Sequence, residues 1–185
     1  MKILLIDNGS KHISKLKDLL KTYLVSTIPC NQVKIQDAIE SNVIIFSGGS
    51  TNSVVGNDNL YKNEINIIKN INKPMLGICL GLELMTYAFG AKLEKLEAKK
   101  QEISQIKIIK KDKIVQGIEN IYAYESHKWV VKKLPQDFIG IAKSNDGYEI
   151  IKHKNKYLYG CQFHPEIINK KTNGHLILNN FLANI

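Results

Sequence analysis

The first half of the chain alternates two hydrophobic patterns, each typical of one kind of element. Short, nearly continuous apolar runs have the length of buried strands, and they lie at Lys2–Ile6, Val25–Ile28, Val43–Phe46 and Pro74–Ile78. Between them, apolar residues recur at helical spacing over His12–Leu24, Asp37–Glu40, Asn59–Ile71 and Gly81–Phe89. Continuous apolar strands are typical of a sheet that is buried on both faces. The alternation therefore predicts an α/β fold, with an open, mostly parallel sheet flanked by helices.

The second half consists mainly of strands. Strand candidates separated by short polar turns lie at Ile103–Ile109, Tyr122–Glu125, Val130–Val131, Phe138–Ala142, Tyr148–Ile151 and Tyr157–Cys161. Asp146-Gly147 and Asn155-Lys156 are turn signals of the kind that join neighbouring strands. A last helix is predicted over His175–Ala183. The sequence shows no internal repeat and no linker rich in Pro or Gly, so we expect a single domain over residues 1–185, with an additional antiparallel strand region.

Length and composition are those of an ordinary globular protein. The 185 residues are 44% hydrophobic and 23% charged, which excludes a disordered, collagen-like or disulfide-scaffold chain. No apolar stretch reaches the length of a membrane span, and the run at Lys2–Ile6 is too short for a signal peptide. The three cysteines form no Cys-x-x-Cys motif, and their number is odd. We therefore expect a cytoplasmic protein with reduced thiols and no membrane contact.

The net charge of +9 raises the question of a nucleic-acid partner. All 26 basic residues are lysines. Arginine, which binds phosphates and guanine bases through two parallel hydrogen bonds, is absent from the chain. We expect a surface of solvated lysines and no nucleic-acid partner, with an acidic protein or ligand as the alternative.

The segment Gly77-Ile78-Cys79-Leu80-Gly81 lies where a predicted strand meets a predicted helix. It is the thiol form of the nucleophile elbow, a turn so tight that flanking side chains collide and glycine is favoured. The start of the helix places partial positive charge near the sulfur of Cys79, and we expect this charge to lower the thiol pKa. The backbone N–H of Leu80 is positioned to stabilise an oxyanion. The alternative is a buried structural cysteine between two unrelated glycines.

A second segment, Gly160-Cys161-Gln162-Phe163-His164-Pro165-Glu166, carries a histidine and an acid two residues apart. In an extended chain the two side chains point to the same side. Glu166 can then orient the ring of His164, and His164 can take the proton of a nucleophilic thiol and later give it to a leaving group. The alternatives are a surface turn and a metal pair formed by Cys161 and His164. Because no second ligand pair lies nearby in the sequence, we expect no metal.

A third segment, Ser47-Gly48-Gly49-Ser50, is predicted as a loop after a buried strand. Ligands bind at the carboxyl ends of parallel strands, and glycines there let backbone N–H groups face a ligand. An ordinary tight turn and a phosphate loop are the alternatives. The segment lacks the Gly-Lys-Ser/Thr sequence of a Walker motif.

Taken in order, these segments resemble the class I (triad) glutamine amidotransferases, through Ser-Gly-Gly, Gly-Ile-Cys-Leu-Gly and Gln-Phe-His-Pro-Glu. The resemblance covers the whole chain and implies a flavodoxin-like sheet. It implies that Cys79 is the nucleophile, His164 the base and Glu166 the orienting acid. Cys79 would attack the side-chain amide of L-glutamine, release ammonia and leave a glutamyl thioester that water then hydrolyses. Gly49 and Leu80 would supply the oxyanion N–H groups, and the reaction would need no cofactor.

Within that family, Ser126-His127-Lys128 followed by Val130-Val131 is similar to the glutaminase of GMP synthase. A stand-alone chain of this length resembles the archaeal two-subunit form, in which a separate ATP-using synthetase makes GMP from XMP. The synthetase is therefore the expected partner and L-glutamine the expected substrate. The resemblance implies substrate contacts from these residues: Gly48, Gly49, Glu83, Ser126, His127, Lys128 and Trp129.

Three residues depart from the pattern of that branch. Glu83 stands where the family usually has Gln, so its carboxylate repels the substrate α-carboxylate unless it is protonated or turned away, or else binds the α-amino group. Ser50 stands in place of the usual Pro and is expected to loosen the oxyanion loop. Trp129 stands in place of the usual Asp and is either an anchor for a partner or a packed aromatic.

The sequence leaves three other functions open. The chain could be the glutaminase component of another amidotransferase pathway, a γ-glutamyl hydrolase of the same fold, or a catalytically weak glutamine-sensing module. Glu83 supports the hydrolase. The presence of Cys79, His164 and Glu166 together argues against the sensor, because an unused reactive thiol is a liability.

Overall fold

The computed structural model describes residues 1–185, and its strands form a nine-stranded sheet in the order β2-β1-β3-β4-β9-β8-β7-β5-β6. The first five strands in this order are parallel. They are β1 (Lys2–Asn8), β2 (Leu24–Pro29), β3 (Val43–Gly49), β4 (Met75–Ile78) and β9 (Leu158–Cys161). Numbered along the chain, these parallel strands follow the flavodoxin-like order, in which ligands bind at the carboxyl ends of the strands.

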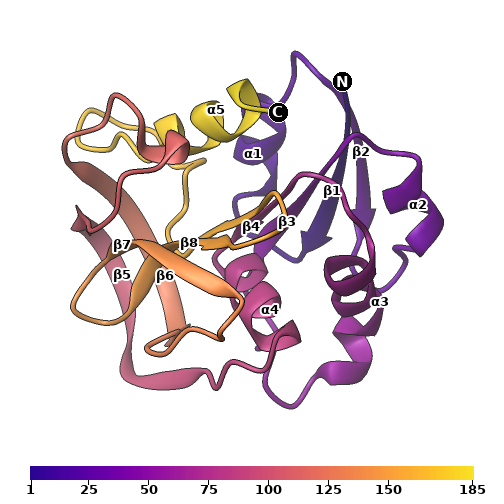
Figure 1. Cartoon of the computed structure of the whole chain (residues 1–185), viewed down its shortest axis with the longest axis horizontal. Coiled ribbons are helices and arrows are strands. Elements are labelled where there is room, and N and C mark those ends of the chain that lie inside the picture. The colour runs from indigo at the N-terminus through magenta and orange to yellow at the C-terminus, as the bar shows by residue number, and fades with distance from the viewer.

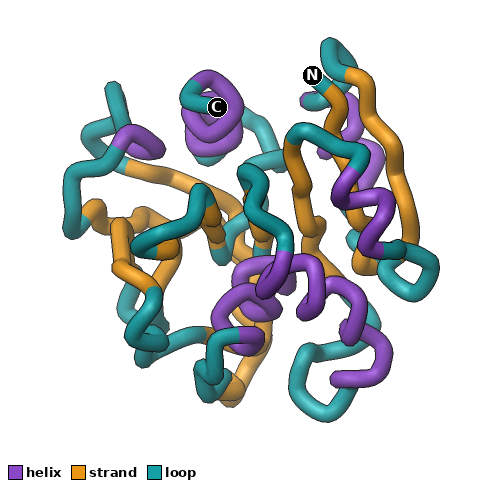
Figure 2. Tube along the Cα trace, turned by 45° about the vertical axis from the view of Figure 1, so that its right-hand side comes forward, coloured by secondary structure: helices purple, strands orange, loops and turns teal.

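Helices cover both faces of the parallel strands (Figure 1). One face carries α1 (Ile13–Leu19) and α5 (His175–Ala183). The other face carries α2 (Ile35–Ile39), α3 (Asp58–Asn70) and α4 (Leu80–Ala88). Figure 2, turned by 45°, shows the same arrangement with helices in purple and strands in orange.

The sequence of β1 explains why helices are needed on both faces. Ile3 and Leu5 belong to the hydrophobic cluster beneath α1 and α5, whereas Leu4 and Ile6 belong to the cluster beneath α2, α3 and α4. Successive residues of a strand face opposite sides of the sheet, so a strand that is buried on both faces must be continuously apolar.

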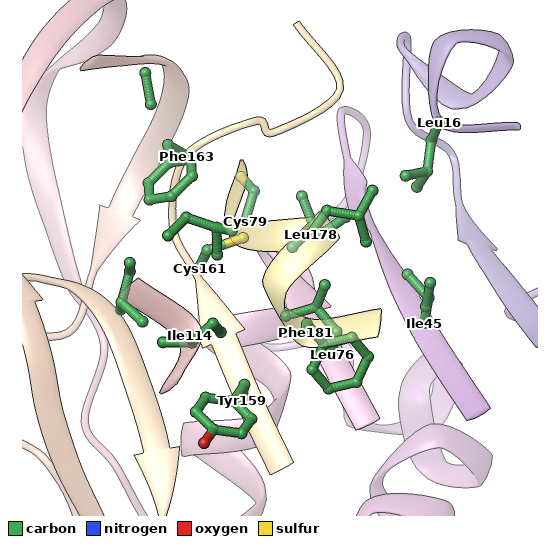
Figure 3. Packing of buried hydrophobic residues seen from close by; sticks show 14 of the residues in the cluster. Leu16, Ile45, Leu76, Cys79, Ile114, Tyr159, Cys161, Phe163, Leu178 and Phe181 are labelled. Carbon is green, nitrogen blue, oxygen red and sulfur yellow. The ribbon is translucent and has the colours of Figure 1, made fainter. Parts of the chain in front are cut away.

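Helix α5 covers the sheet with a compact apolar face. Its residues Ile177, Leu178 and Phe181 are almost completely buried. Figure 3 shows Leu178 and Phe181 among the other side chains of this cluster, which include Leu76 of β4 and Cys161 of β9. Full burial of a side chain of this size stabilises the folded state by about 1.5–3 kcal/mol, so this face fixes α5 on the sheet.

The other four strands extend the sheet in antiparallel fashion beyond β9. They are β5 (Glu94–Ile108), β6 (Ile121–Val130), β7 (Phe138–Lys143) and β8 (Tyr148–His153). Strand β5 connects two parts of the sheet, because Lys107 and Ile108 pair with β7 while its earlier residues pair with β6. A short 3-10 helix, η1 (Lys113–Val115), follows β5.

The predicted fold class is confirmed, and each strand and helix of the first half lies where the pattern places it. Two boundaries there differ. Helix α1 ends at Leu19 rather than Leu24, because Leu24 already pairs with Lys2 as the first residue of β2. Strand β3 continues through Gly49, because Gly49 pairs with Asn8 of β1, so the predicted loop begins only at Ser50.

Two predictions for the second half were wrong in extent. Strand β5 begins at Glu94 rather than at residue 103. The candidate at 122–125 and Val130 of the next candidate belong to a single strand, β6, which ends before Val131. Pairing between these two strands explains both differences, since Glu94 pairs with Val130 and Glu102 pairs with Glu125.

The parallel strands place the candidate residues at one edge of the sheet. Gly48 and Gly49 end β3, Cys79 follows β4, and His164 and Glu166 follow β9. The parallel arrangement therefore brings the three sequence motifs to the same edge. No helix is long and apolar enough to span a membrane.

Candidate active site

Cys79 occupies the tight turn between β4 and α4. Its φ of 50° and ψ of −104° make it the one residue other than glycine with positive φ. A Cβ atom on Gly77 would lie 2.5 Å from the carbonyl carbon of Gly81, and one on Gly81 would lie 2.6 Å from the carbonyl oxygen of Phe46. Both glycines are therefore required sterically, and the strained backbone aims the thiol away from the strand.

The sulfur of Cys79 is buried and has only long polar contacts. Gln162 Nε2 lies 3.9 Å from Sγ, and the carbonyl oxygen of Ser126 lies 4.0 Å from it. Burial raises the thiol pKa well above its ordinary value, the carboxylates of Glu83 and Glu166 raise it further, and the N–H of Leu80 lowers it. We expected the start of α4 to lower the thiol pKa, and this prediction was wrong. Desolvation of the sulfur raises the pKa by more than the single N–H lowers it.

His164 and Glu166 form the hydrogen-bonded pair that their spacing predicts. His164 Nδ1 lies 2.8 Å from Glu166 Oε1, and both side chains are buried. The backbone N–H of His164 donates to the carbonyl oxygen of Tyr124 at 2.8 Å, which ties this segment to β6. His164 Nε2 is buried and has no hydrogen-bond partner, so it is the ring nitrogen that is free to exchange a proton.

Gly48 lies between the ring of His164 and the nucleophile. A Cβ atom on Gly48 would lie 3.0 Å from His164 Cε1 and 3.6 Å from Cys79 Cβ. No hydrogen bond joins Cys79 Sγ to His164 in this structure, which is common in ligand-free sites of this kind. The absence of a side chain at Gly48 lets the ring approach the thiol.

A cavity of about 390 Å³ opens beside Cys79 and His164. Leu80 and all but one of the predicted substrate contacts line it, namely Gly49, Glu83, Ser126, His127, Lys128 and Trp129. Gly48 does not line the cavity, because it lies against His164, and Glu166 lies outside the lining as well. The structure thus brings Cys79, His164 and six of the seven predicted substrate residues to one cavity.

The proposed oxyanion residues lie side by side. A Cβ atom on Gly49 would come within 2.6 Å of Leu80 Cδ1 and 3.0 Å of the backbone oxygen of Asn8, so a side chain at this position would displace Leu80. The loosening expected from Ser50 in place of Pro stays a prediction, and in this structure the Ser50 side chain attaches the loop that follows β3. Its hydroxyl donates to the carbonyl oxygen of Gly9 at 2.7 Å and fastens the loop to the end of β1.

Glu83 is turned toward Gln162 inside the site. Gln162 Nε2 donates to Glu83 Oε1 at 3.1 Å, and burial raises the pKa of the Glu83 carboxyl to about 7. The sequence motif contains Gln162 but assigns it no role. Its position beside both Glu83 and Cys79 shows that it connects the nucleophile to the wall of the cavity.

Several cavity residues were missed because their sequences carry no chemical motif. The loop after β1 contributes Ser10, Lys11 and His12, the loop after β3 contributes residues 51–53, and β5 contributes Lys95 and Lys99. The available signal was topological, since the first two loops follow the carboxyl ends of parallel strands.

Cys161 and Trp129 differ in their access to the cavity. Cys161 is fully buried in the hydrophobic cluster of Figure 3 and does not line the cavity. Trp129 is half-buried, packs against the other cluster and lines the cavity. Lys95 Nζ lies 5.6 Å from the centre of its ring.

A buried polar cluster supports the wall of the cavity. Lys100 Nζ lies 2.8 Å from Glu125 Oε2 and 2.7 Å from Asp146 Oδ2, and His127 Nε2 lies 2.9 Å from the same oxygen of Glu125. The carboxylate of Glu149 completes a group with Glu125 and His127 that has the donor atoms of a metal site. The ammonium of Lys100 already supplies positive charge there, so this cluster fits a structural role better than a metal-binding one.

Comparisons with known proteins agree with this geometry. The family model for glutamine amidotransferase class-I matches residues 4–185. The glutamine-hydrolysing GMP synthase subunit of Methanocaldococcus jannaschii is 34% identical, over 97% of this chain and 95% of its own. The corresponding protein of Pyrococcus abyssi is also 34% identical, over 97% of this chain and 96% of its own.

Solved structures support the fold. A candidate GMP synthase subunit from Thermoplasma acidophilum has a TM-score of 0.88 at 24% identity, covering 99% of this chain and 92% of its own. A glutamine amidotransferase from Thermotoga maritima has a TM-score of 0.75 at 14% identity, covering 100% of this chain and 81% of its own. With the family model matching nearly every residue and the relatives aligned end to end, the chain belongs to the class I glutamine amidotransferase family.

Proposed function

We propose that this chain is the glutamine-hydrolysing component of a two-subunit GMP synthase and passes ammonia to a separate ATP-using synthetase. The observation that carries the hydrolytic part is Cys79, held at positive φ beside a cavity that His164 also lines, with the Nε2 atom of His164 left without a hydrogen-bond partner. The names of the relatives from M. jannaschii and P. abyssi support the pathway.

The reaction begins with transfer of the Cys79 proton to His164 as the sulfur attacks the side-chain amide carbon of glutamine. The protonated ring then gives its proton to the departing nitrogen, so that ammonia leaves and a glutamyl thioester remains. His164 next takes a proton from water, and the hydroxide attacks the thioester carbon. The carbon–sulfur bond breaks, glutamate forms, and His164 returns its proton to the departing sulfur, which restores the thiol. Glu166 holds the ring by its Nδ1 atom throughout.

The raised pKa of Cys79 determines when the thiol proton moves during the reaction. A buried thiol with two carboxylates nearby does not ionise alone at neutral pH. The proton must move to His164 while the carbon–sulfur bond forms, and the negative charge moves to the amide oxygen. In our proposal the N–H groups of Gly49 and Leu80 receive that charge.

Glu83 is the one carboxylate that lines the cavity, whose other charged residues include four lysines, Lys11, Lys95, Lys99 and Lys128. A free amino acid carries both an α-ammonium and an α-carboxylate. In our proposal the ammonium binds the Glu83 carboxylate, while the lysines attract the α-carboxylate.

The experiment that tests the function reconstitutes GMP formation. This chain is mixed with the stand-alone synthetase of the same organism, ATP, XMP and either glutamine or ammonium chloride. We expect glutamine to support GMP formation, and we expect Cys79→Ala to abolish it. The same variant should leave the ammonium-dependent rate unchanged, because ammonium bypasses the thioester.

Each outcome decides a different part of the proposal. Glutamine-dependent GMP formation that survives Cys79→Ala would contradict the thioester mechanism. Hydrolysis of glutamine without any GMP, although the synthetase is active with ammonium, would contradict the pathway and favour another amidotransferase. An absence of glutamine hydrolysis with and without the synthetase would overturn the glutaminase assignment itself.

A further inference from the structure

His12 lies at the edge of the catalytic cavity and has no role in the mechanism above. It follows the loop after β1 and immediately precedes α1. Its side chain is half-buried, lines the cavity and makes no capping hydrogen bond to the helix that it precedes. The backbone N–H of His12 donates to Ser10 Oγ at 3.1 Å, and this hydrogen bond holds the backbone from which the ring extends. The ring therefore has a defined position and no local structural task.

Three aromatic rings meet beside the nucleophile. The ring centres of His12 and His164 lie 5.3 Å apart with an interplanar angle of 77°, which is an edge-to-face contact. His12 makes a second contact of this kind with Tyr124, at 6.1 Å and 84°. Tyr124 in turn lies 6.2 Å from His164. Edge-to-face contacts at these distances are attractive and directional, so they hold ring planes at fixed angles.

The other contacts of His164 leave one degree of freedom that these rings can restrict. Glu166 holds Nδ1, and Gly48 lies close to Cε1. A single hydrogen bond at Nδ1 still allows the ring to tilt about that bond. Tilting moves Nε2, the atom that must exchange protons with Cys79 and the leaving group. Displacement of a proton donor by a fraction of an ångström lowers a rate strongly, because proton transfer depends on close approach.

The charge state of His12 matters to its neighbour. The charged groups that face it are His164 and Glu166 from the segment after β9, Lys11 beside it in the loop and Lys15 of α1. Burial lowers the pKa of His12, a protonated His164 and the two lysines lower it further, and Glu166 raises it. His12 is therefore neutral at neutral pH, and its ring can lie beside the imidazolium that His164 becomes during the reaction.

We propose that the ring of His12 is a positioning residue, which in its neutral form holds the plane of His164 and thereby the direction of Nε2. Protonation of His12 places a second positive charge next to His164 and opposes formation of the imidazolium. The inference deepens the proposed glutaminase function and rests on it for its kinetic test.

The test compares His12→Phe, which keeps a ring, with His12→Ala, which removes it. Steady-state glutamine hydrolysis is measured from pH 5 to pH 8.5. At pH 8 we expect kcat of His12→Ala to fall about tenfold with KM changed less than threefold, and His12→Phe to restore kcat to within about threefold of wild type. At the acidic end of this range, where protonation of wild-type His12 increases, we expect His12→Phe to lose relatively less activity than wild type. Lys17→Ala, an exposed change on α1 that lies outside the cavity and is not among the charges that act on His12, is the matched control and should leave kcat unchanged.

A second readout separates this inference from the glutaminase assignment. The rate at which iodoacetamide alkylates Cys79 is measured across the same pH range in a Cys30→Ser background, by intact mass. Thiolate formation still requires His164, so His12→Ala should slow alkylation severalfold and His12→Phe should restore it, even if wild type hydrolyses no glutamine.

Three results would overturn parts of the positioning role. Wild-type kcat and wild-type alkylation rate in His12→Ala would show that the ring does nothing for His164. Equal losses in His12→Phe and His12→Ala would show that the imidazole acts through its nitrogen atoms rather than as a ring. If kcat decreases toward low pH in the same way in wild type and in His12→Phe, the requirement for the neutral form of His12 is overturned.

Discussion

Glu83 is the residue whose replacement tells most about substrate recognition. Its carboxyl has a pKa of about 7, so the carboxylate form grows as the pH rises from 6 to 8. If the carboxylate binds the substrate ammonium, KM for glutamine falls over the same range. Glu83→Gln removes the charge but keeps the shape and the hydrogen-bonding capacity toward Gln162. We expect its KM to be about tenfold higher than that of wild type at pH 8 and independent of pH between 6 and 8.

The measurement is steady-state glutamine hydrolysis at pH 6, 7 and 8. Glu119→Gln, which changes an exposed carboxylate outside the cavity, serves as the control. A lower KM in Glu83→Gln would instead mean that Glu83 hinders glutamine binding, as its repulsion of the α-carboxylate predicts.

Single residues were predictable where chemistry requires a particular type at a particular spacing. The tight turn at Cys79 between two glycines, and the pairing of His164 with Glu166, could be predicted because few residue types satisfy those requirements. His12 could not be identified, because its relation to His164 depends on folding across more than 150 positions. The raised pKa of Cys79 could not be predicted either, since desolvation depends on burial that a local motif does not reveal.

A buried ion pair joins β5 and β6 in addition to their backbone pairing. Lys100 of β5 lies between Glu125 of β6 and Asp146 of the turn between β7 and β8. Burial raises the pKa of Glu125, but hydrogen bonds from His127 and Lys100 outweigh this and keep the pKa below its ordinary value. Removing the ammonium leaves a buried carboxylate with only His127 as a partner. We therefore expect Lys100→Met to lower the free energy of unfolding by about 3 kcal/mol at pH 7.

Urea unfolding checks this prediction, with Lys99→Met as the neighbouring exposed control on the same strand. The difference in the free energy of unfolding between wild type and Lys100→Met should become smaller near pH 4. At that pH Glu125 is protonated in the variant and no longer bears an unpaired charge. Unfolding free energies that are equal for wild type and Lys100→Met at pH 7 would show that the pair makes no net contribution.

The early part of β5 shows why this element was underestimated. Residues 94–102 are mostly Glu, Lys, Gln and Ala, which favour helices or loops rather than strands, and most are exposed. Their strand conformation comes from pairing with β6, and the register shifts between Lys95 and Lys100. Lys95 and Lys99, which lie in this irregular stretch, line the cavity. Long-range pairing of this kind overrides local preference and leaves little trace in a hydrophobic pattern.

For the whole molecule, the parallel half was predictable because burial on both faces imposes an apolar sequence on each strand. The strand order was not, since β9 joins β4 from the far end of the chain. That addition is what brings His164 and Glu166 to Cys79. A family resemblance implied this proximity, whereas the residues alone suggested only three separate motifs.

Two buried carboxyls outside the cavity lining make the stability of the whole molecule depend on pH. Burial raises the pKa of Glu64 of α3 to about 8, and both of its carboxyl oxygens lack hydrogen-bond partners. Burial and the neighbouring Glu125 raise the pKa of Glu149 of β8 to about 8 as well. In the unfolded chain both carboxyls ionise near pH 4.5. Between pH 4.5 and 8 the folded state therefore holds protons that the unfolded state has lost.

The sign of the effect follows from this difference in bound protons. Each carboxyl contributes fully to the free energy of unfolding at pH values below its pKa in the unfolded chain. The contribution is lost as the pH rises toward its pKa in the folded protein, by about 1.4 kcal/mol per pH unit for each group. Between pH 6.5 and 8 the free energy of unfolding should fall by roughly 1 to 2 kcal/mol for each carboxyl. Urea unfolding at these two pH values measures the fall, and Glu64→Gln, which cannot ionise, should remove about half of it. A stability that is flat or rising over this interval, or a slope that Glu64→Gln leaves unchanged, would mean that Glu64 is already ionised in the folded protein.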